Sequence, residues 1–134
     1  MSCFPPTGVF CWNELLTRDV DAAKAHYAAV FGWTYEPGPE GPCYWVAHLG
    51  TTPVAGLFQM EGEAFEGIPP HWFSYIATDA LEATVATLEA NGGIVLRPPF
   101  QVGPFRIALM KDVTGAAIGL TQLVSEGDAA GEPG

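Results

Sequence analysis

The pattern of hydrophobic and polar positions passes from strand-like to helix-like spacing near residue 19, and it does so again near residue 79. Residues 9–16 are apolar and β-favouring, which predicts a strand. Asp19 is a good N-cap and Gly32 a natural C-cap, so we expect a helix over residues 20–31 with its buried face at positions 20, 23, 27 and 30. Three short β-rich runs follow, at residues 33–35, 43–49 and 54–60.

The same order of elements returns in the second half of the chain. Residues 71–78 alternate as a strand. Leu81, Val85 and Leu88 then mark the buried face of a second helix, which ends at residues 91–93. A Pro-rich connection at residues 97–103 separates the first two of three further strands, predicted at residues 94–96, 104–110 and 116–123.

Two local echoes indicate that the chain is an internal repeat. Val-Ala-Gly-Leu at 54–57 matches Ala-Ile-Gly-Leu at 117–120 with an offset of 63 residues, and Gly-Pro at 41–42 matches Gly-Pro at 103–104 with an offset of 62. We therefore predict an α+β fold of two βαβββ modules in tandem, forming a cup-shaped mixed sheet with the helices outside. The predicted boundaries are an N-terminal segment (1–7), the first module (8–60), a linker (61–70), the second module (71–123) and a disordered tail (124–134).

Further motifs accompany the repeat. A helix start of the form D-x-D-A-A-x-x-H-Y spans residues 19–27 and closes on Phe31-Gly32-Trp33, and a D-x-x-G turn spans residues 112–115. With the two modules, these motifs resemble the vicinal oxygen chelate superfamily of glyoxalase I, bleomycin-resistance proteins and extradiol dioxygenases. The resemblance covers about residues 8–123. W-N-E-L at 12–15 and P-P-H-W-F at 69–73 narrow it to a mostly uncharacterised subgroup.

The resemblance implies one metal ligand in the first strand and one in the last strand of each module. Metal-dependent members of the superfamily place His, Gln or Glu there around a divalent ion, which polarises substrate oxygens as a Lewis acid. In this chain the matching positions hold side chains that cannot bind a metal: Trp12, Gly56, Phe73 and Gly119. We therefore predict no cofactor. The less favoured alternative is a divalent metal held by relocated ligands at Glu14, His48 and His71.

Alternation along the first and fifth strands predicts that aromatic side chains line the cup together with a few polar groups. An apolar cleft with a few converging polar groups is the usual form of a small-molecule site. Flat aromatic walls suit planar ligands, and Glu14 could bind a cation or act as a general base. In a purely structural interpretation, Glu14 pairs with Arg106 and the aromatic rings fill the cup. The predicted ligand-binding residues are Phe10, Trp12, Glu14, His71, Phe73, Tyr75 and Arg106, with Glu14 as the catalytic candidate.

Charge and cysteine content exclude several classes of partner. Fifteen Asp and Glu residues against five Lys and Arg residues give a net charge of −10, which disfavours nucleic acids and anionic membrane surfaces. No apolar run approaches the length of a membrane span. Three cysteines without CxxC spacing, and no visible secretion signal, favour a reduced, cytoplasmic protein.

Three functions agree with these features, and the sequence leaves open whether the protein is an enzyme. The first is a metal-free small-molecule binding protein of the sequestration or resistance type. The second is a metal-dependent lyase or dioxygenase that uses the relocated ligands. The third is a metal-independent acid–base enzyme using Glu14. A homodimer is expected by analogy with the superfamily.

Overall fold

The computed structural model describes residues 5–38 and 43–124. The chain divides into two units: Trp12–Phe73 forms the N-terminal unit, and Met1–Cys11 together with Ser74–Gly134 forms the C-terminal unit. The predicted module boundaries stay predictions. The Gly-Pro pair at 41–42 and the tail from residue 125 onward lie outside the described residues.

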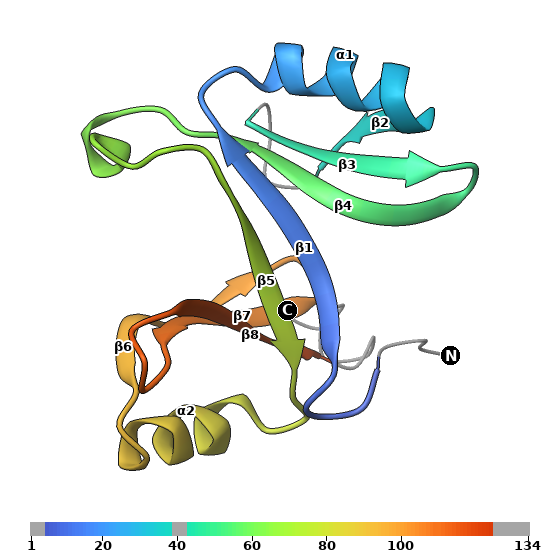
Figure 1. The fold of residues 1–134 in the computed structure, drawn as a ribbon. Helices are drawn as coiled ribbons and strands as arrows, with labels where there is room; N and C mark the ends of the chain where they lie inside the picture. Colours follow the sequence, from blue (N-terminus) through green and yellow to red (C-terminus); the bar gives the residue numbers. More distant parts are fainter. Residues whose placement is uncertain (1–4, 39–42, 125–134) are drawn as a thin grey trace. The chain divides into compact units, whose positions relative to one another are not determined.

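Two βαβββ modules follow one another along the chain, which confirms the predicted α+β fold class (Figure 1). The first consists of β1 (Phe10–Thr17), α1 (Val20–Phe31), β2 (Thr34–Pro37), β3 (Tyr44–Leu49) and β4 (Thr52–Gln59). The second consists of β5 (His71–Ala77), α2 (Leu81–Ala90), β6 (Ile94–Val102), β7 (Phe105–Lys111) and β8 (Ala117–Leu123). A 3-10 turn, η1 (Glu63–Phe65), lies in the segment between them.

The strand order is the same in both modules and confirms the internal repeat. The first module is ordered β2-β3-β4-β1 and the second β6-β7-β8-β5, with the first strand parallel to the last in each. Glu14 lies opposite Gly56 in the first module, and Tyr75 lies opposite Gly119 in the second. Gly56 and Gly119, which the sequence echo places 63 residues apart, therefore occupy equivalent positions.

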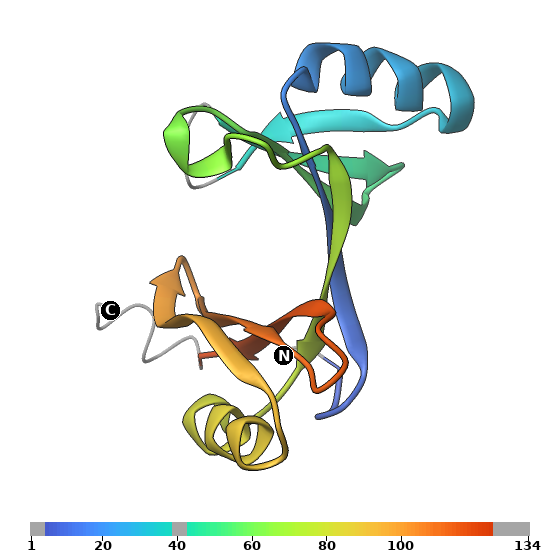
Figure 2. The same cartoon turned by 60° about the vertical axis from the view of Figure 1, so that its left-hand side comes forward.

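Each unit has its own hydrophobic core between a helix and one face of its strands. Figures 1 and 2 show α1 over the strands of the first module and α2 over those of the second. Under α1 the core consists of Leu15, Val20, Ala47, Ala55 and Leu57. Under α2 it consists of Leu81, Val85, Ala108, Met110 and Leu120. Full burial of one such Leu or Met contributes about 1.5–3 kcal/mol. Val30, at the end of the predicted buried face of α1, is instead 54% exposed.

The D-x-x-G motif forms the turn between β7 and β8. Asp112 Oδ1 accepts hydrogen bonds from the backbone N–H groups of Thr114 at 2.8 Å and Ala116 at 3.1 Å. Hydrogen bonds from the Thr114 side chain and from these N–H groups hold the pKa of the Asp112 carboxyl below its ordinary value. The stability that this turn contributes is therefore present above the ordinary carboxyl pKa and is lost as pH falls through the lowered one.

The first turn of each helix is capped by a glutamine from the last strand of the same module. Val20 N–H donates to Gln59 Oε1 at 2.9 Å, and Leu81 N–H donates to Gln122 Oε1 at 2.8 Å. N–H groups in the first turn have no acceptor within the helix, so each glutamine satisfies one of them. In α1, Asp19 Oδ1 also accepts from Ala22 N–H, whereas the N-cap residue of α2 makes no side-chain cap bond.

We expect Gln122→Ala to lower the free energy of unfolding by about 1–2 kcal/mol and Gln59→Ala by about 1 kcal/mol. The first loss is larger because α2 has no second side-chain cap. Urea unfolding followed by circular dichroism measures both. Gln101→Ala is the matched control, since Gln101 is exposed and its amide donates to Gly103 O within a turn, so its loss should stay within about 0.5 kcal/mol. Equal losses in all three variants would contradict the capping role.

Candidate functional site

Trp12 and Glu14 lie on the face of the N-terminal unit that α1 does not cover. Leu15 packs into the core under α1, and side chains alternate along a strand, so Trp12, Glu14 and Leu16 point to the opposite face. All three side chains are half-buried. We call this surface the open face of the N-terminal unit. It holds a carboxylate and an indole among apolar neighbours.

A tyrosine from β3 joins the two side chains in a hydrogen-bonded chain. Trp12 Nε1–H donates to Tyr44 Oη at 3.0 Å, and Tyr44 Oη–H donates to Glu14 Oε1 at 3.1 Å. One phenolic hydroxyl can accept and donate at once, so the two bonds are compatible. A hydrogen bond donated to a carboxylate is charge-assisted and favours its ionised form. The arrangement therefore orients the Glu14 carboxyl group on the open face.

Gly56 provides the room for the Tyr44 ring. A Cβ atom built on Gly56 would lie 1.8 Å from Tyr44 Oη and 2.5 Å from Tyr44 Cζ. Because Gly56 is the partner of Glu14 in the parallel β1–β4 register, the missing side chain brings the hydroxyl to the carboxylate. Glycine within a strand often marks such a close approach.

In the C-terminal unit a glycine likewise leaves room for a tyrosine ring. A Cβ atom on Gly119 would lie 2.2 Å from Cδ2 of Tyr75, whose side chain is buried. The Tyr75 ring thus packs directly over the glycine. Phe10, also in this unit, is 61% exposed.

Arg106 is a predicted ligand-binding residue whose face the sequence leaves open, and it lies on the helix-covered face of the C-terminal unit. Ala108 and Met110 have the same parity on β7 and are buried under α2, whereas Ile76 in that core turns Tyr75 to the other face. The Arg106 guanidinium forms an ion pair with Glu82 of α2, and the hydrogen bond from Arg106 holds the pKa of the Glu82 carboxyl below its ordinary value.

The proposed relocated metal ligands do not assemble. Glu14, His48 and His71 all belong to the N-terminal unit, yet within residues 5–38 and 43–124 no group of three or more His, Cys, Asp or Glu side chains could hold a metal ion. His71 Nδ1 lies 2.9 Å from Pro69 O, and its ring packs edge-on against Phe73 at 6.4 Å. His48 lies on β3 opposite Thr34 and Pro53. The described residues therefore give no support to the alternative of a relocated metal site.

The free cysteines of the described chain are not activated nucleophiles. Burial raises the pKa of the Cys11 thiol, whose Sγ contacts Tyr75 O at 3.6 Å. Desolvation and the neighbouring Glu61 carboxylate raise the pKa of the Cys43 thiol. A reactive cysteine needs a lowered pKa, so neither side chain suits nucleophilic catalysis.

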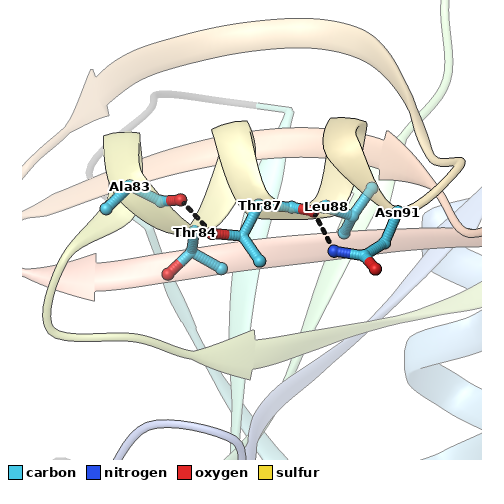
Figure 3. Close-up of a pocket in the computed structure, with 5 residues that line it drawn as sticks. All are labelled: Ala83, Thr84, Thr87, Leu88 and Asn91. Carbon is cyan, nitrogen blue, oxygen red and sulfur yellow. Dashed lines mark hydrogen bonds between the residues drawn. The ribbon is translucent and has the colours of Figure 1, made fainter.

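A hollow beside α2 offers no group suited to catalysis (Figure 3). Two of its polar side chains bond to their own helix: Thr87 Oγ1–H donates to Ala83 O at 2.9 Å, and the Asn91 amide donates to Thr87 O at 2.8 Å. The third, Thr84, has its Oγ1 at 2.7 Å from Thr78 Oγ1, before the helix begins. The hollow is lined by Ala83, Thr84, Thr87, Leu88 and Asn91, none of which titrates near neutral pH.

Comparison with models of known protein families shows which family the chain belongs to. The model of the Glyoxalase/Bleomycin resistance protein/Dioxygenase superfamily matches residues 10–120. The chain belongs to this superfamily. The resemblance drawn from its motifs is thereby confirmed.

Curated members of the superfamily are similar over most of the chain. A protein named putative glyoxylase CFP32, from Mycobacterium tuberculosis, is 41% identical over 115 residues, covering 83% of this chain and 44% of that protein. Anthracycline biosynthesis protein DnrV from Streptomyces peucetius is 31% identical, covering 100% of this chain and 54% of that protein. The chain thus spans about half the length of the curated relatives it matches.

Solved structures of superfamily members share the fold. Methylmalonyl-CoA epimerase from Mycobacterium tuberculosis superposes with a TM-score of 0.65 at 14% identity, covering 96% of this chain and 97% of that one. The Mn(II)-bound glyoxalase from Novosphingobium aromaticivorans gives a TM-score of 0.62 at 19% identity, covering 89% and 40%. At these identities the likeness concerns architecture.

This member differs from metal-dependent members of the superfamily at the positions that the motif resemblance assigns to metal ligands. Trp12 supplies an indole N–H, which is a donor only, and Phe73 supplies no polar atom. Gly56 and Gly119 supply no side chain, and tyrosine rings occupy the space above them. The residues present at these four positions do not fit a divalent metal.

Neither helix of the described chain is long and apolar enough to cross a membrane.

Proposed function

We propose that the protein binds a planar aromatic small molecule on the open face of the N-terminal unit, without a metal ion. The observation that carries this proposal is the hydrogen-bonded chain from Trp12 through Tyr44 to Glu14. It presents one oriented carboxylate and one indole among apolar side chains, at a place where a metal-dependent relative would need ligands. Small-molecule sites are usually apolar surfaces with a few fixed polar groups.

Two further facts support a planar aromatic ligand. The Trp12 indole offers a flat apolar surface, and aromatic rings in offset or edge contact contribute about 0.5–1.5 kcal/mol beyond the burial of their area. A relative that is 31% identical over the whole chain is named for anthracycline biosynthesis, and anthracyclines contain a planar fused-ring system. Binding without turnover corresponds to a sequestration or resistance protein.

The remaining predicted ligand-binding residues divide between the two units. His71 and Phe73 belong to the N-terminal unit and stay within the proposal. Phe10 and Tyr75 belong to the C-terminal unit, and their role in ligand binding stays a prediction. A homodimer in the cytoplasm also remains part of the proposal. The free thiols of Cys11 and Cys43 agree with a reducing compartment.

Titration with a soluble anthracycline tests the proposal. Fluorescence anisotropy of the ligand should show saturable binding. The dissociation constant should be the same in the presence of a chelator as in the presence of added manganese. Trp12→Leu should weaken binding by about tenfold, since loss of one aromatic contact of about 1.4 kcal/mol corresponds to that factor.

Trp72→Leu is the matched control for this titration. Trp72 belongs to the same unit, is 43% exposed, and packs edge-on against Tyr27 and Trp33, away from the hydrogen-bonded chain. Its removal should leave anthracycline binding unchanged. Binding that requires a divalent metal, or binding that Trp12→Leu leaves intact, would overturn the proposal.

A metal-independent acid–base enzyme is the second candidate function. The observation that favours it is the hydroxyl of Tyr44 at 3.1 Å from Glu14, because a carboxylate beside a proton donor is suited to proton transfer. Full turnover in a Glu14→Gln variant, measured on any substrate the protein converts, would exclude this role.

A further inference from the structure

The open face carries an anion in a setting that can distinguish charged from neutral ligands. Glu14 is half-buried, and its Oε1 accepts a hydrogen bond from Tyr44, which is only 9% exposed. A carboxylate that is partly withdrawn from water interacts more strongly with a nearby charge than one in bulk solvent. The affinity of this face for a ligand therefore depends more on the ligand's charge than on its apolar area alone.

The Trp12 indole beside Glu14 also favours a positively charged ligand. Trp12 donates its N–H to Tyr44 Oη, which fixes the plane of the ring on the open face. The face of an indole attracts cations, with a gain of about twofold to thirtyfold in affinity depending on exposure. The chain's net charge of −10 adds a long-range field that draws cations toward the protein.

We infer that the ligand of the open face is a planar cation, and that Tyr44 is a positioning residue that keeps Glu14 in the state that recognises it. The inference rests on the proposed function. Tyr44 acts through Glu14: its hydroxyl donates to the carboxylate and is itself oriented by Trp12. Gly56 makes the arrangement possible, because any Cβ there would take the place of the hydroxyl.

The titratable groups around Glu14 determine how ligand binding on the open face can depend on pH. In the first module, β4 lies beside β1 and presents Gly56 and Phe58 on this face, with no ionisable side chain there. The next strand, β3, presents Tyr44 and His48. The part of β5 within the N-terminal unit carries His71. Each of these two histidines therefore needs its own control.

Two ring systems of similar size separate charge from shape. N-methylacridinium carries a positive charge that does not change with pH, and acridone is a neutral ring of comparable area. Full-length protein should bind N-methylacridinium at least tenfold more tightly than acridone at pH 7.5 and low salt, with the preference reduced at high salt. Glu14→Gln should abolish the preference.

Tyr44→Phe tests the positioning role through pH. Without the phenolic donor the carboxylate binds protons more readily, so the pH midpoint for N-methylacridinium binding should move upward. We expect binding about tenfold weaker than wild type at pH 5 and within about threefold of wild type at pH 8. His48→Gln and His71→Gln should leave the position of the Glu14-dependent midpoint unchanged.

Each outcome bears on a separate statement. A protein that binds the anthracycline but shows no preference for N-methylacridinium over acridone retains the proposed function and overturns the cation inference. A Tyr44→Phe variant that unfolds at the same urea concentration as wild type, yet loses binding equally at every pH, overturns the positioning role. A protein that binds no planar ring at all overturns the proposed function itself.

Discussion

Replacing Gly119 with alanine is expected to lower the free energy of unfolding by about 2–3 kcal/mol. The new Cβ would lie 2.2 Å from Tyr75 Cδ2 and 2.9 Å from Tyr75 Cγ. Because Cγ is the base of the ring, rotation of the ring does not relieve the contact, and strands β5 and β8 must shift. Urea unfolding monitored by circular dichroism measures the loss.

A double-mutant cycle with Tyr75→Ala shows whether the ring is the cause. Alanine lacks the Cγ and Cδ2 atoms that the new Cβ would meet, so Gly119→Ala should cost little when Tyr75 is already alanine. The coupling energy is expected to exceed about 1 kcal/mol, well above the deviation typical of independent sites. Additive losses from the two single variants would show that the contact with Tyr75 is not what requires glycine.

Gly56→Ala is expected to affect binding more than stability. Its Cβ would meet Tyr44 at Oη and Cζ, the far end of the ring, which can swing aside. The free energy of unfolding should therefore fall by only about 1–2 kcal/mol. The displaced hydroxyl would leave Trp12 and Glu14, and the ring would occupy part of the open face. N-methylacridinium binding at pH 7 should weaken by at least about tenfold, since a hydrogen bond to a charged group corresponds to that factor or more.

The control for Gly56→Ala removes the Tyr44 hydroxyl, with which the new Cβ atom would clash. In Gly56→Ala combined with Tyr44→Phe, the closest contact, at 1.8 Å from Oη, no longer exists. This double variant should regain part of the lost stability without regaining wild-type binding at pH 5. A folded Gly56→Ala protein that binds as tightly as wild type would show that the Tyr44 position does not matter to the ligand.

The fold could be predicted because its signals are local. Asp19, Gly32 and the helical spacing behind them bound α1 without reference to any other strand. The repeat then identified the second module, in which β8 matches β4. β6 was predicted as residues 94–96 but extends from Ile94 to Val102. Its Pro98 and Pro99 suggested a connection, yet β6 pairs with β7 and ends the strand order, where a sheet tolerates proline.

The candidate site was predictable only where one strand determines it. Alternation along β1 puts Trp12 and Glu14 on one face, because side-chain direction in a strand depends on parity alone. Tyr44 could not be found in this way, since its bond to Glu14 joins residues 30 positions apart. A glycine inside a predicted strand, Gly56, was the available signal that another side chain approaches closely. The face of Arg106 depends on where β7 enters its register with β8, which composition does not reveal.

The glutamine caps also constrain the order in which the chain can acquire structure during synthesis. Gln59 follows Val20 by 39 residues, and Gln122 follows Leu81 by 41. As the chain emerges from the ribosome, the first turn of each helix lacks this hydrogen bond until the last strand of the module has been made. Each helix therefore reaches its full stability only when its own module is complete, and each module can reach that point without waiting for the other's cap.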